Sequence, residues 1–255
     1  MKYYLLDNLA YSMGVEQKVT PGRIHPSPVI ELGKPGEWDE KRIQFSSVIY
    51  DPAKEKFRMW YLGLGNEPEC VEGDGPGCVV HRGVSYLGNT KQGYAESLDG
   101  ERWAKPALGL AEYNGSRDNN IVPVHPALPG SPMAIYDPEE GDDSHTDKMV
   151  LSNGGGASLA FSDDGIHWRS YANGENLYKC GSERGCDECF DLFTQEPYSF
   201  VKDPDTRDEN RRYLIYTQAS SGPPHWVRRT GLAYSLDARR WTALRAYPAR
   251  SMGWR

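Results

Sequence analysis

The sequence of 255 residues lacks the features of a membrane protein or a nucleic-acid-binding protein. No apolar run approaches the roughly 20 residues that are needed to cross a bilayer. Acidic residues outnumber basic ones, for a net charge of −7, and basic residues form only short pairs such as Arg211-Arg212. Because phosphate backbones repel an acidic chain, we expect no nucleic acid and no membrane as a partner.

A secretion signal and a full set of paired cysteines are also missing. The N-terminal residues reach Asp7 before an apolar segment forms, so we predict no signal peptide and a cytoplasmic protein. The odd count of five cysteines argues against a disulfide framework. Cys180, Cys186 and Cys189 could bind zinc with a fourth ligand, but such sites usually pair two Cys-x-x-Cys knuckles and only one is present. We therefore expect loop cysteines, no metal site and no organic cofactor.

Glycine, proline and aromatic residues are plentiful. The 27 Gly and 18 Pro residues are typical of many short strands joined by turns. The 16 Tyr and 7 Trp residues suit strands, and they also suit surfaces that bind sugars. This composition favours an all-β domain.

One pattern occurs three times along the chain. Two strands flank an Asp-Pro turn, and a third strand ends in a turn that reads Ser-x-Asp-Gly-x-x-Trp in its first two copies. The turn tryptophans Trp103, Trp168 and Trp241 are 65 and 73 residues apart, which suits large four-stranded blades. We predict an all-β fold, a β-propeller of four-stranded antiparallel blades. Its first strands are expected at Arg42–Asp51, Gly130–Asp137 and Thr194–Asp203.

The repeat divides a single propeller domain, residues 1–255, into blades. We expect N-terminal strands within 1–39, at Tyr3–Leu6 and Pro28–Leu32. Blades follow at about 40–104, 105–169 and 170–242, and 243–255 would start a further blade. Five such blades would need more than about 300 residues. We therefore expect a chain cut from a longer product, with an exposed blade edge that promotes aggregation or dimerisation.

Aspartates recur at both turns of every copy. Because an Asp side chain bonds its own backbone in turns, we interpret these residues as turn formers and not as catalysts. They are Asp51, Asp137 and Asp203 in the first turn, and Asp99, Asp164 and Asp237 in the second. Ala238 replaces the turn glycine in the third copy, and a positive φ there would cost on the order of 1 kcal/mol.

The catalytic residues should be polar groups that break the repeat. The innermost strand of each blade lines the channel of a propeller, and ligands bind at one mouth. Seven residues before each first-turn aspartate stand Gln44, Gly130 and Glu196, of which only Glu196 is a carboxylate. Pro197 favours an extended backbone at Glu196. Glu196 is therefore a candidate general acid, although a solvated residue at a strand end would look the same.

Further polar residues precede the three first strands, where they could also be ordinary loop residues. The candidates for a second carboxylate are Asp39, Glu40 and Asp191. The candidates for contacts with substrate are Trp38, Gln44, Asp118, His125, Gln195 and Trp226.

The repeated Ala-x-Ser-x-Asp-Gly-x-x-Trp element, the link Trp103–Val122 and the opening Tyr3–Glu40 resemble the five-bladed propeller glycosidases of families 32, 43, 68 and 130. The resemblance covers nearly the whole chain and implies a carbohydrate substrate. In family 43 a first-blade Asp is the base, a second-blade Asp tunes the pKa, and a third-blade Glu is the acid. Glu196-Pro197-Tyr198 is similar to that acid motif, whereas Gln44 and Gly130 stand where the two aspartates would be.

The resemblance implies a glycoside hydrolase with two carboxylates. Glu196 would protonate the leaving oxygen, and Asp39 would be the base or nucleophile, with Glu40 as its replacement. Two alternatives stay open. One is a non-catalytic carbohydrate-binding propeller. The other is a glycoside phosphorylase, for which Arg42 and His81-Arg82 are the available basic residues.

Overall fold

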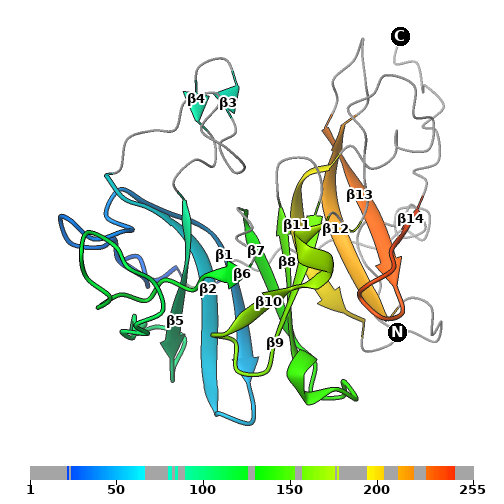
Figure 1. Cartoon of the computed structure of the whole chain (residues 1–255), viewed down its shortest axis with the longest axis horizontal. Helices are drawn as coiled ribbons and strands as arrows, with labels where there is room; N and C mark the ends of the chain where they lie inside the picture. Colours follow the sequence, from blue (N-terminus) through cyan, green and yellow to red (C-terminus); the bar gives the residue numbers. More distant parts are fainter. Residues whose placement is uncertain are drawn as a thin grey trace.

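The fold consists of mainly antiparallel sheets, as a computed structural model of the chain shows (Figure 1). The structure describes residues 22, 24–66, 80–81, 84–85, 90–125, 130–152, 157–175, 177, 194–203, 212–220 and 228–244. Within these ranges the helices η1 (Asp143–His145) and η2 (Tyr171–Gly174) are short 3₁₀ segments, and neither is long and apolar enough to span a membrane. The predicted all-β class with antiparallel, blade-like sheets is confirmed.

The first sheet, here called blade 1, has the strand order β1-β2-β5. These strands are β1 (Arg42–Asp51), β2 (Lys56–Leu64) and β5 (Lys91–Ser97). In place of the expected fourth strand, β5 forms two isolated antiparallel bridges, Glu96 with Ala104 and Gly93 with Ile121. The small hairpin of β3 (Val80–His81) and β4 (Val84–Ser85) stands apart (Figure 1).

One strand prediction before blade 1 is wrong. Residues 28–32 form bends and irregular backbone instead of the strand predicted at Pro28–Leu32. Pro26 and Pro28 have no N–H group to donate to a ladder, which accounts for the difference. The strand predicted at Tyr3–Leu6 lies outside the described residues.

The second sheet, blade 2, has the order β6-β10-β9-β8-β7. Its strands are β6 (Val124–His125), β7 (Pro132–Tyr136), β8 (Asp147–Ser152), β9 (Ala157–Ser162) and β10 (Trp168–Ser170). The repeat predicts four of these strands. The fifth, β6, pairs parallel with β10 and comes from the link before the repeat.

The third sheet, blade 3, has the order β11-β12-β13-β14. Its strands are β11 (Thr194–Lys202), β12 (Tyr213–Ser220), β13 (Arg228–Ser235) and β14 (Thr242–Leu244). The first strand of each blade is thus the edge of its sheet, as the sequence predicts for Arg42–Asp51, Gly130–Asp137 and Thr194–Asp203.

The turn aspartates act as predicted. Asp99, Asp164 and Asp237 each accept backbone N–H groups two and three residues ahead. The N–H groups of Arg102 and Glu101 lower the pKa of Asp99 to about 2. Ala238 adopts φ of 60°, so the third copy does place a side chain in the left-handed region.

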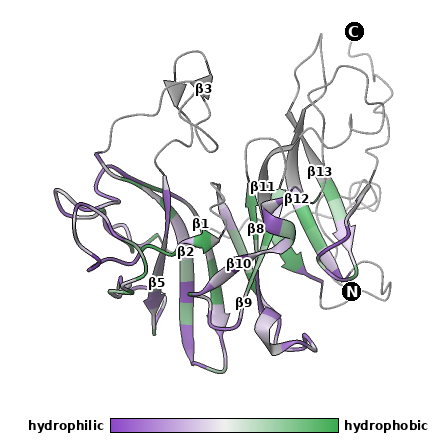
Figure 2. Cartoon of the chain, in the orientation of Figure 1, coloured by the Kyte–Doolittle hydropathy of each residue, from purple (hydrophilic) through white to green (hydrophobic). Residues whose placement is uncertain are grey.

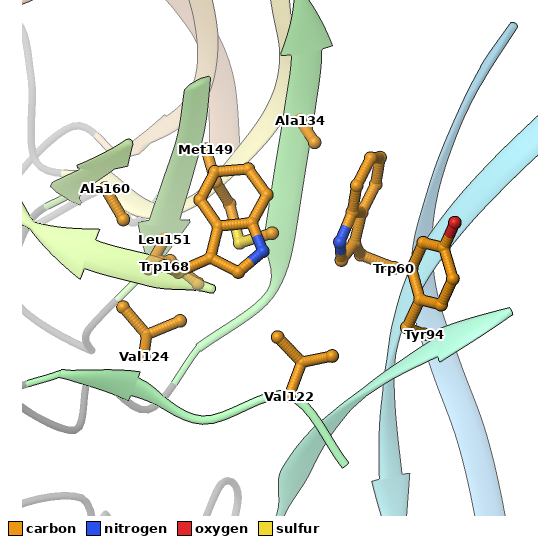
Figure 3. Packing of buried hydrophobic residues seen from close by; sticks show 9 residues of the cluster. All are labelled: Trp60, Tyr94, Val122, Val124, Ala134, Met149, Leu151, Ala160 and Trp168. Carbon is orange, nitrogen blue, oxygen red and sulfur yellow. The ribbon is translucent and has the colours of Figure 1, made fainter. Parts of the chain in front are cut away.

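Apolar side chains fill the spaces between the blades. In Figure 3, Trp60 and Tyr94 of blade 1 face Trp168, Met149 and Leu151 of blade 2. A second cluster joins Phe161 and Val150 of blade 2 to Phe200, Tyr213 and Ile215 of blade 3. Figure 2 shows hydrophobic residues along the central strands and hydrophilic residues at many turns. Burial of these clusters is what holds neighbouring sheets together.

Charged groups are buried at the interface between blades 1 and 2. Arg58, wholly buried, donates from Nη1 and Nη2 to the two carboxylate oxygens of Asp147 at 2.6 and 2.7 Å. Its Nε lies 3.1 Å from Oδ2 of the buried Asp51. Trp60 Nε1 donates to the Gly165 carbonyl at 2.8 Å and so links the same two blades.

The interface between blades 2 and 3 is centred on one carboxylate, Asp137. Its oxygens lie 2.5 Å from Lys202 Nζ, 3.3 Å from Arg212 Nη2 and 3.6 Å from Lys148 Nζ. Tyr213 donates its hydroxyl proton to Asp137 Oδ2 at 2.5 Å. A residue predicted to form a turn therefore also joins two blades.

Candidate functional site

The first strands of the three blades begin at a common end. Arg58 joins Asp51, the last residue of β1, to Asp147, which pairs with the last residue of β7. Tyr213, which pairs with the last residue of β11, bonds Asp137, just after β7. Because these ends meet, the three strands run in the same direction. Their starts therefore share the opposite end, here called the rim.

The rim strands also contact one another directly. β7 contacts both β1 and β11. Ser47 Oγ of β1 donates to the carbonyl of Ala134 at 3.2 Å and accepts from its N–H at 2.9 Å. The three edges are thus adjacent, as inner strands of neighbouring blades should be.

Three predicted positions lie at the rim. Gln44 is half-buried on β1 and pairs with Leu62, and Gly130 lies two residues before β7. Glu196 lies on β11, two residues after its start, beside a register shift at Pro197. The side chains of Glu196 and Gln195 lie outside the described residues, as does that of His125 on β6.

One rim residue was not predicted from the sequence. Ser131, directly before β7, is buried, and within the described part of the chain its Oγ has no hydrogen-bond partner. Buried hydroxyls without a partner are rare, and they often meet a ligand or a water molecule. A single serine carries no pattern that sequence reasoning could have used.

Several predicted residues cannot be placed. Asp191, Trp226 and the cysteines Cys180, Cys186 and Cys189 lie outside the described residues. Among the residues that are described, no three His, Cys, Asp or Glu side chains gather where they could hold a metal ion.

A second group of predicted residues lines a polar pocket of about 330 Å³ beside blade 1. Trp38, Asp39 and Asp118 meet there, although about 80 residues separate the first two from the third. Sequence reasoning missed Lys105 and Tyr113, which are among the other residues that line this pocket. Asp118 is exposed, so it can meet a ligand that enters the pocket.

A hydrogen-bond network lies behind this pocket. Trp38 Nε1 donates to Asn120 Oδ1 at 2.8 Å, and Asn120 Nδ2 donates to Tyr61 Oη at 2.7 Å. Tyr61 in turn donates to Asp39 Oδ2 at 2.8 Å, and Lys105 Nζ donates to the same oxygen at 2.6 Å. Burial, together with the Asp39 carboxylate, raises the pKa of Tyr61, so its hydroxyl remains a donor. The network holds the residues in place.

The network changes the roles expected of two residues. Trp38 is only 2 % exposed and stacks on Tyr61, so its ring offers little surface for the contact with substrate that the sequence predicts. Asp39 is only 1 % exposed, and its Oδ2 already accepts two hydrogen bonds. Glu40 is half-buried and accepts the N–H of Gly36 with one oxygen at 2.7 Å. Of these two carboxylates, Glu40 is therefore the more accessible.

The fold and the rim define a class of protein, an all-β protein built of propeller-like blades. No protein-family model matches the chain, and no curated protein matches it. The search of solved structures finds a glycosyl hydrolase from Bacteroides ovatus, with 15 % identity and a TM-score of 0.45. The match covers 79 % of this chain and 50 % of that one.

Two other solved structures are similar to a comparable extent. A fructofuranosidase from Schwanniomyces occidentalis, in complex with fructosylnystose, has 12 % identity and a TM-score of 0.47 over 84 % of this chain and 38 % of that one. A structure from the GH130 family of mannoside phosphorylases and hydrolases has 15 % identity and a TM-score of 0.45 over 80 % and 51 %. The chain thus spans about half the length of these structures or less.

Proposed function

We propose that this protein is a glycoside hydrolase that cleaves an oligosaccharide or polysaccharide at the rim. The observation that supports the proposal is the common end of β1, β7 and β11. Of the three corresponding positions there, Gln44, Gly130 and Glu196, only Glu196 is a carboxylate. An acid on a strand is held on a rigid element, as a proton donor to a glycosidic oxygen requires.

Glycoside hydrolysis needs a second carboxylate near the first. Glu40 takes this role in the proposal, because it is half-buried and uses one oxygen for the Gly36 N–H. Asp39, bound by Tyr61 and Lys105, positions the segment instead of meeting the substrate. Asp191 is a further candidate for the second carboxylate.

A non-catalytic carbohydrate-binding protein is the second candidate function. One observation favours it: Asp39, the base that the family resemblance implies, is buried and already bonded. This alternative requires sugar binding without bond cleavage.

A screen of defined oligosaccharides for release of reducing sugar tests the proposal. We expect release that does not depend on inorganic phosphate. Release only in the presence of phosphate would show a phosphorylase instead. Binding of an oligosaccharide without release would show the binding protein.

The assignment of the second carboxylate has its own test. Glu40→Gln should lower turnover strongly and leave the unfolding midpoint nearly unchanged, since its carboxylate is partly solvated. Asp39→Asn should mainly lower the unfolding midpoint, because it weakens a buried bond to Lys105. The opposite outcome, in which Asp39→Asn alone removes turnover from a stable protein, would return the role to Asp39.

A further inference from the structure

A second pocket, here called the interblade pocket, lies between blades 2 and 3. Its volume is about 300 Å³, at the lower end of ligand pockets. It is lined by Ser144, His145, Phe161, Ser162, Asp163, His167, Arg169, Ser170, Tyr171, Ala172 and Arg239. His145 follows β7 and Arg239 lies in the turn before β14, so the pocket opens at the end of the strands away from the rim.

Aromatic rings form one wall of the interblade pocket. The ring of His145 lies over Phe161, with centroids 4.2 Å apart, and Tyr171 meets Phe161 edge to face at 6.1 Å. The guanidinium of Arg239 stands 5.0 Å from the Phe161 centroid. Phe161 is itself buried beneath these groups, so the half-buried Tyr171 offers the aromatic surface that the ring of a small polar ligand can meet.

The guanidinium groups of Arg169 and Arg239 have N–H donors that are available to a ligand. Within the described part of the chain, neither Arg169 nor Arg239 forms an ion pair with a carboxylate. Arg169 is exposed, and Arg239 is half-buried. Arg239 donates from Nη1 to the Asp237 carbonyl at 3.4 Å, and its Nη2 lies 3.1 Å from His145 Nδ1. An arginine has five N–H donors and prefers planar oxyanions.

The hydrogen bond between Arg239 and His145 competes with a second interaction of the same histidine atom. The same Nδ1 atom of His145 lies 2.9 Å from Asp142 Oδ2 and 3.1 Å from Arg239 Nη2. It can donate to the aspartate or accept from the arginine, but it cannot do both at once. Arg239 is therefore free to turn toward a better acceptor.

The nearby carboxylates of Asp164 and Asp142 are bonded to other groups and do not pair with Arg169 or Arg239. Asp164 accepts from two backbone N–H groups, and its other oxygen lies 2.7 Å from His167 Nδ1. Asp142 accepts from Ser144 at the start of η1. Asp163 is exposed at the pocket wall and can accept a hydrogen bond from a hydroxyl group of a ligand.

The wall of the pocket also contains strained backbone. Ala172, which lines it, has φ of 49°, and the next residue, Asn173, has φ of 53°. Two successive non-glycine residues in the left-handed region are unfavourable, and such strain gathers at ligand sites.

We propose that the interblade pocket binds an acidic sugar, with its carboxylate held by Arg169 and Arg239 and its ring against the half-buried Tyr171. A sugar as ligand rests on the proposed function, whereas oxyanion binding follows from the pocket alone. The pocket would hold part of an acidic saccharide chain away from the rim.

Calorimetric titration of the intact chain with glucuronate, glucose and inorganic phosphate tests the proposal. We expect glucuronate to bind more tightly than either of the others. Arg169→Gln and Arg239→Gln should each weaken glucuronate binding roughly ten-fold or more, because each removes a charge-assisted hydrogen bond. Arg240→Gln is the matched control: it makes the same change one residue from Arg239, at an exposed side chain outside the pocket.

Several results would overturn the proposal. If glucose bound as tightly as glucuronate, the pocket would not recognise the carboxylate. If phosphate bound as tightly as glucuronate, the pocket would not recognise the sugar ring. Unchanged affinity in both arginine variants would place the ligand elsewhere. Arg169 is exposed, so its variant should fold normally even if Arg239→Gln disturbs the interface. Glu196→Gln should leave glucuronate binding unchanged, because Glu196 lies at the rim. Binding at the interblade pocket can therefore be tested even if the protein proves not to be a hydrolase.

Discussion

The interface between blades 1 and 2 buries one cation between two carboxylates, whereas the interface between blades 2 and 3 gathers three cations around the buried Asp137, with Glu139 and Glu140 bound to two of them. At the first, Arg58 is fully enclosed with Asp51 and Asp147. At the second, Lys202 and Arg212 keep part of their side chains in solvent. The charge balance of the first interface therefore depends mainly on one buried cation, whereas the second interface distributes its positive charge over three side chains.

The acidities of the two central carboxylates reflect this difference. Burial raises the pKa of Asp147, in spite of the hydrogen bonds from Arg58. Burial also works to raise the pKa of Asp137, but the bonds from Lys202 and Tyr213 outweigh it, and the pKa is lowered. The two interfaces thus hold their central carboxylates in different ways, although both carboxylates belong to blade 2.

The largest expected effect comes from removing the one cation of the first interface. Arg58→Met removes the cation that pairs with the buried Asp147 and leaves Asp51 with its turn N–H groups and the more distant Lys54, which should cost about 3–5 kcal/mol of unfolding free energy. Lys202→Met, the matched change at the second interface, should cost about 1 kcal/mol, since Lys148 and Arg212 remain and the group is partly exposed. Urea unfolding of both variants measures the difference.

A double variant sharpens this test. Arg58→Met combined with Asp147→Met replaces the ion pair by apolar groups, so part of the loss should be recovered. Equal losses in Arg58→Met and Lys202→Met would contradict the comparison between the interfaces.

The turn glycines give a smaller contrast. A methyl group on Gly165 would collide with Arg58 Nη1 and lie 2.9 Å from Trp60 Cζ2, whereas on Gly100 the nearest atom is Phe57 Cε2 at 3.6 Å. Both glycines have positive φ, 80° and 76°. Gly165→Ala should therefore cost about 2–4 kcal/mol, and Gly100→Ala only about 1 kcal/mol. Thermal unfolding of the pair would show no difference if the first interface tolerated the added methyl.

The two carboxylates should respond to acid in opposite directions. Because the folded pKa of Asp137 is lowered, its contribution to stability is present above the unfolded value of about 4 and is lost as the pH falls through the folded pKa. Asp147 has a raised pKa, so its charged form opposes folding above that pKa and the penalty is relieved on acidification.

Substitution by asparagine separates these contributions. Asp137→Asn should reduce the loss of stability between pH 5 and about pH 2, as urea midpoints measured across this range would show. An unchanged pH dependence in Asp137→Asn would contradict the sharing of charge at the second interface.

The smallest effect is expected at the third copy of the turn. Ala238→Gly relieves a positive φ but removes a buried methyl from the cluster around Phe161. The two contributions, each about 1 kcal/mol, nearly cancel, so the unfolding free energy should change by less than about 0.5 kcal/mol. A gain above 1 kcal/mol would mean that the methyl contributes little to this interface.

The sequence was sufficient to predict most strands and turns of the repeat, because these depend on neighbours along the chain. It did not predict β6, and it wrongly predicted a strand at Pro28–Leu32. The bounds expected for the first strand, Arg42–Asp51, agree with those of β1. Charge partners were not predictable, since Arg58 and Asp147 lie 89 residues apart and no periodicity connects them. Trp38 was misjudged for the same reason, because Asn120 and Tyr61, which enclose it, come from distant segments.

The central claim, that Glu196 is the general acid of a hydrolase, is tested most directly by turnover in two variants. Glu55→Gln makes the same chemical change in the turn after β1, at the end away from the rim. On an oligosaccharide that the wild-type protein cleaves, Glu196→Gln should lose roughly 10²–10⁴-fold in turnover and Glu55→Gln should lose almost nothing. Activated aryl glycosides should be affected less by Glu196→Gln, since their leaving groups need little protonation. Turnover by Glu196→Gln that equals that of Glu55→Gln would contradict the account.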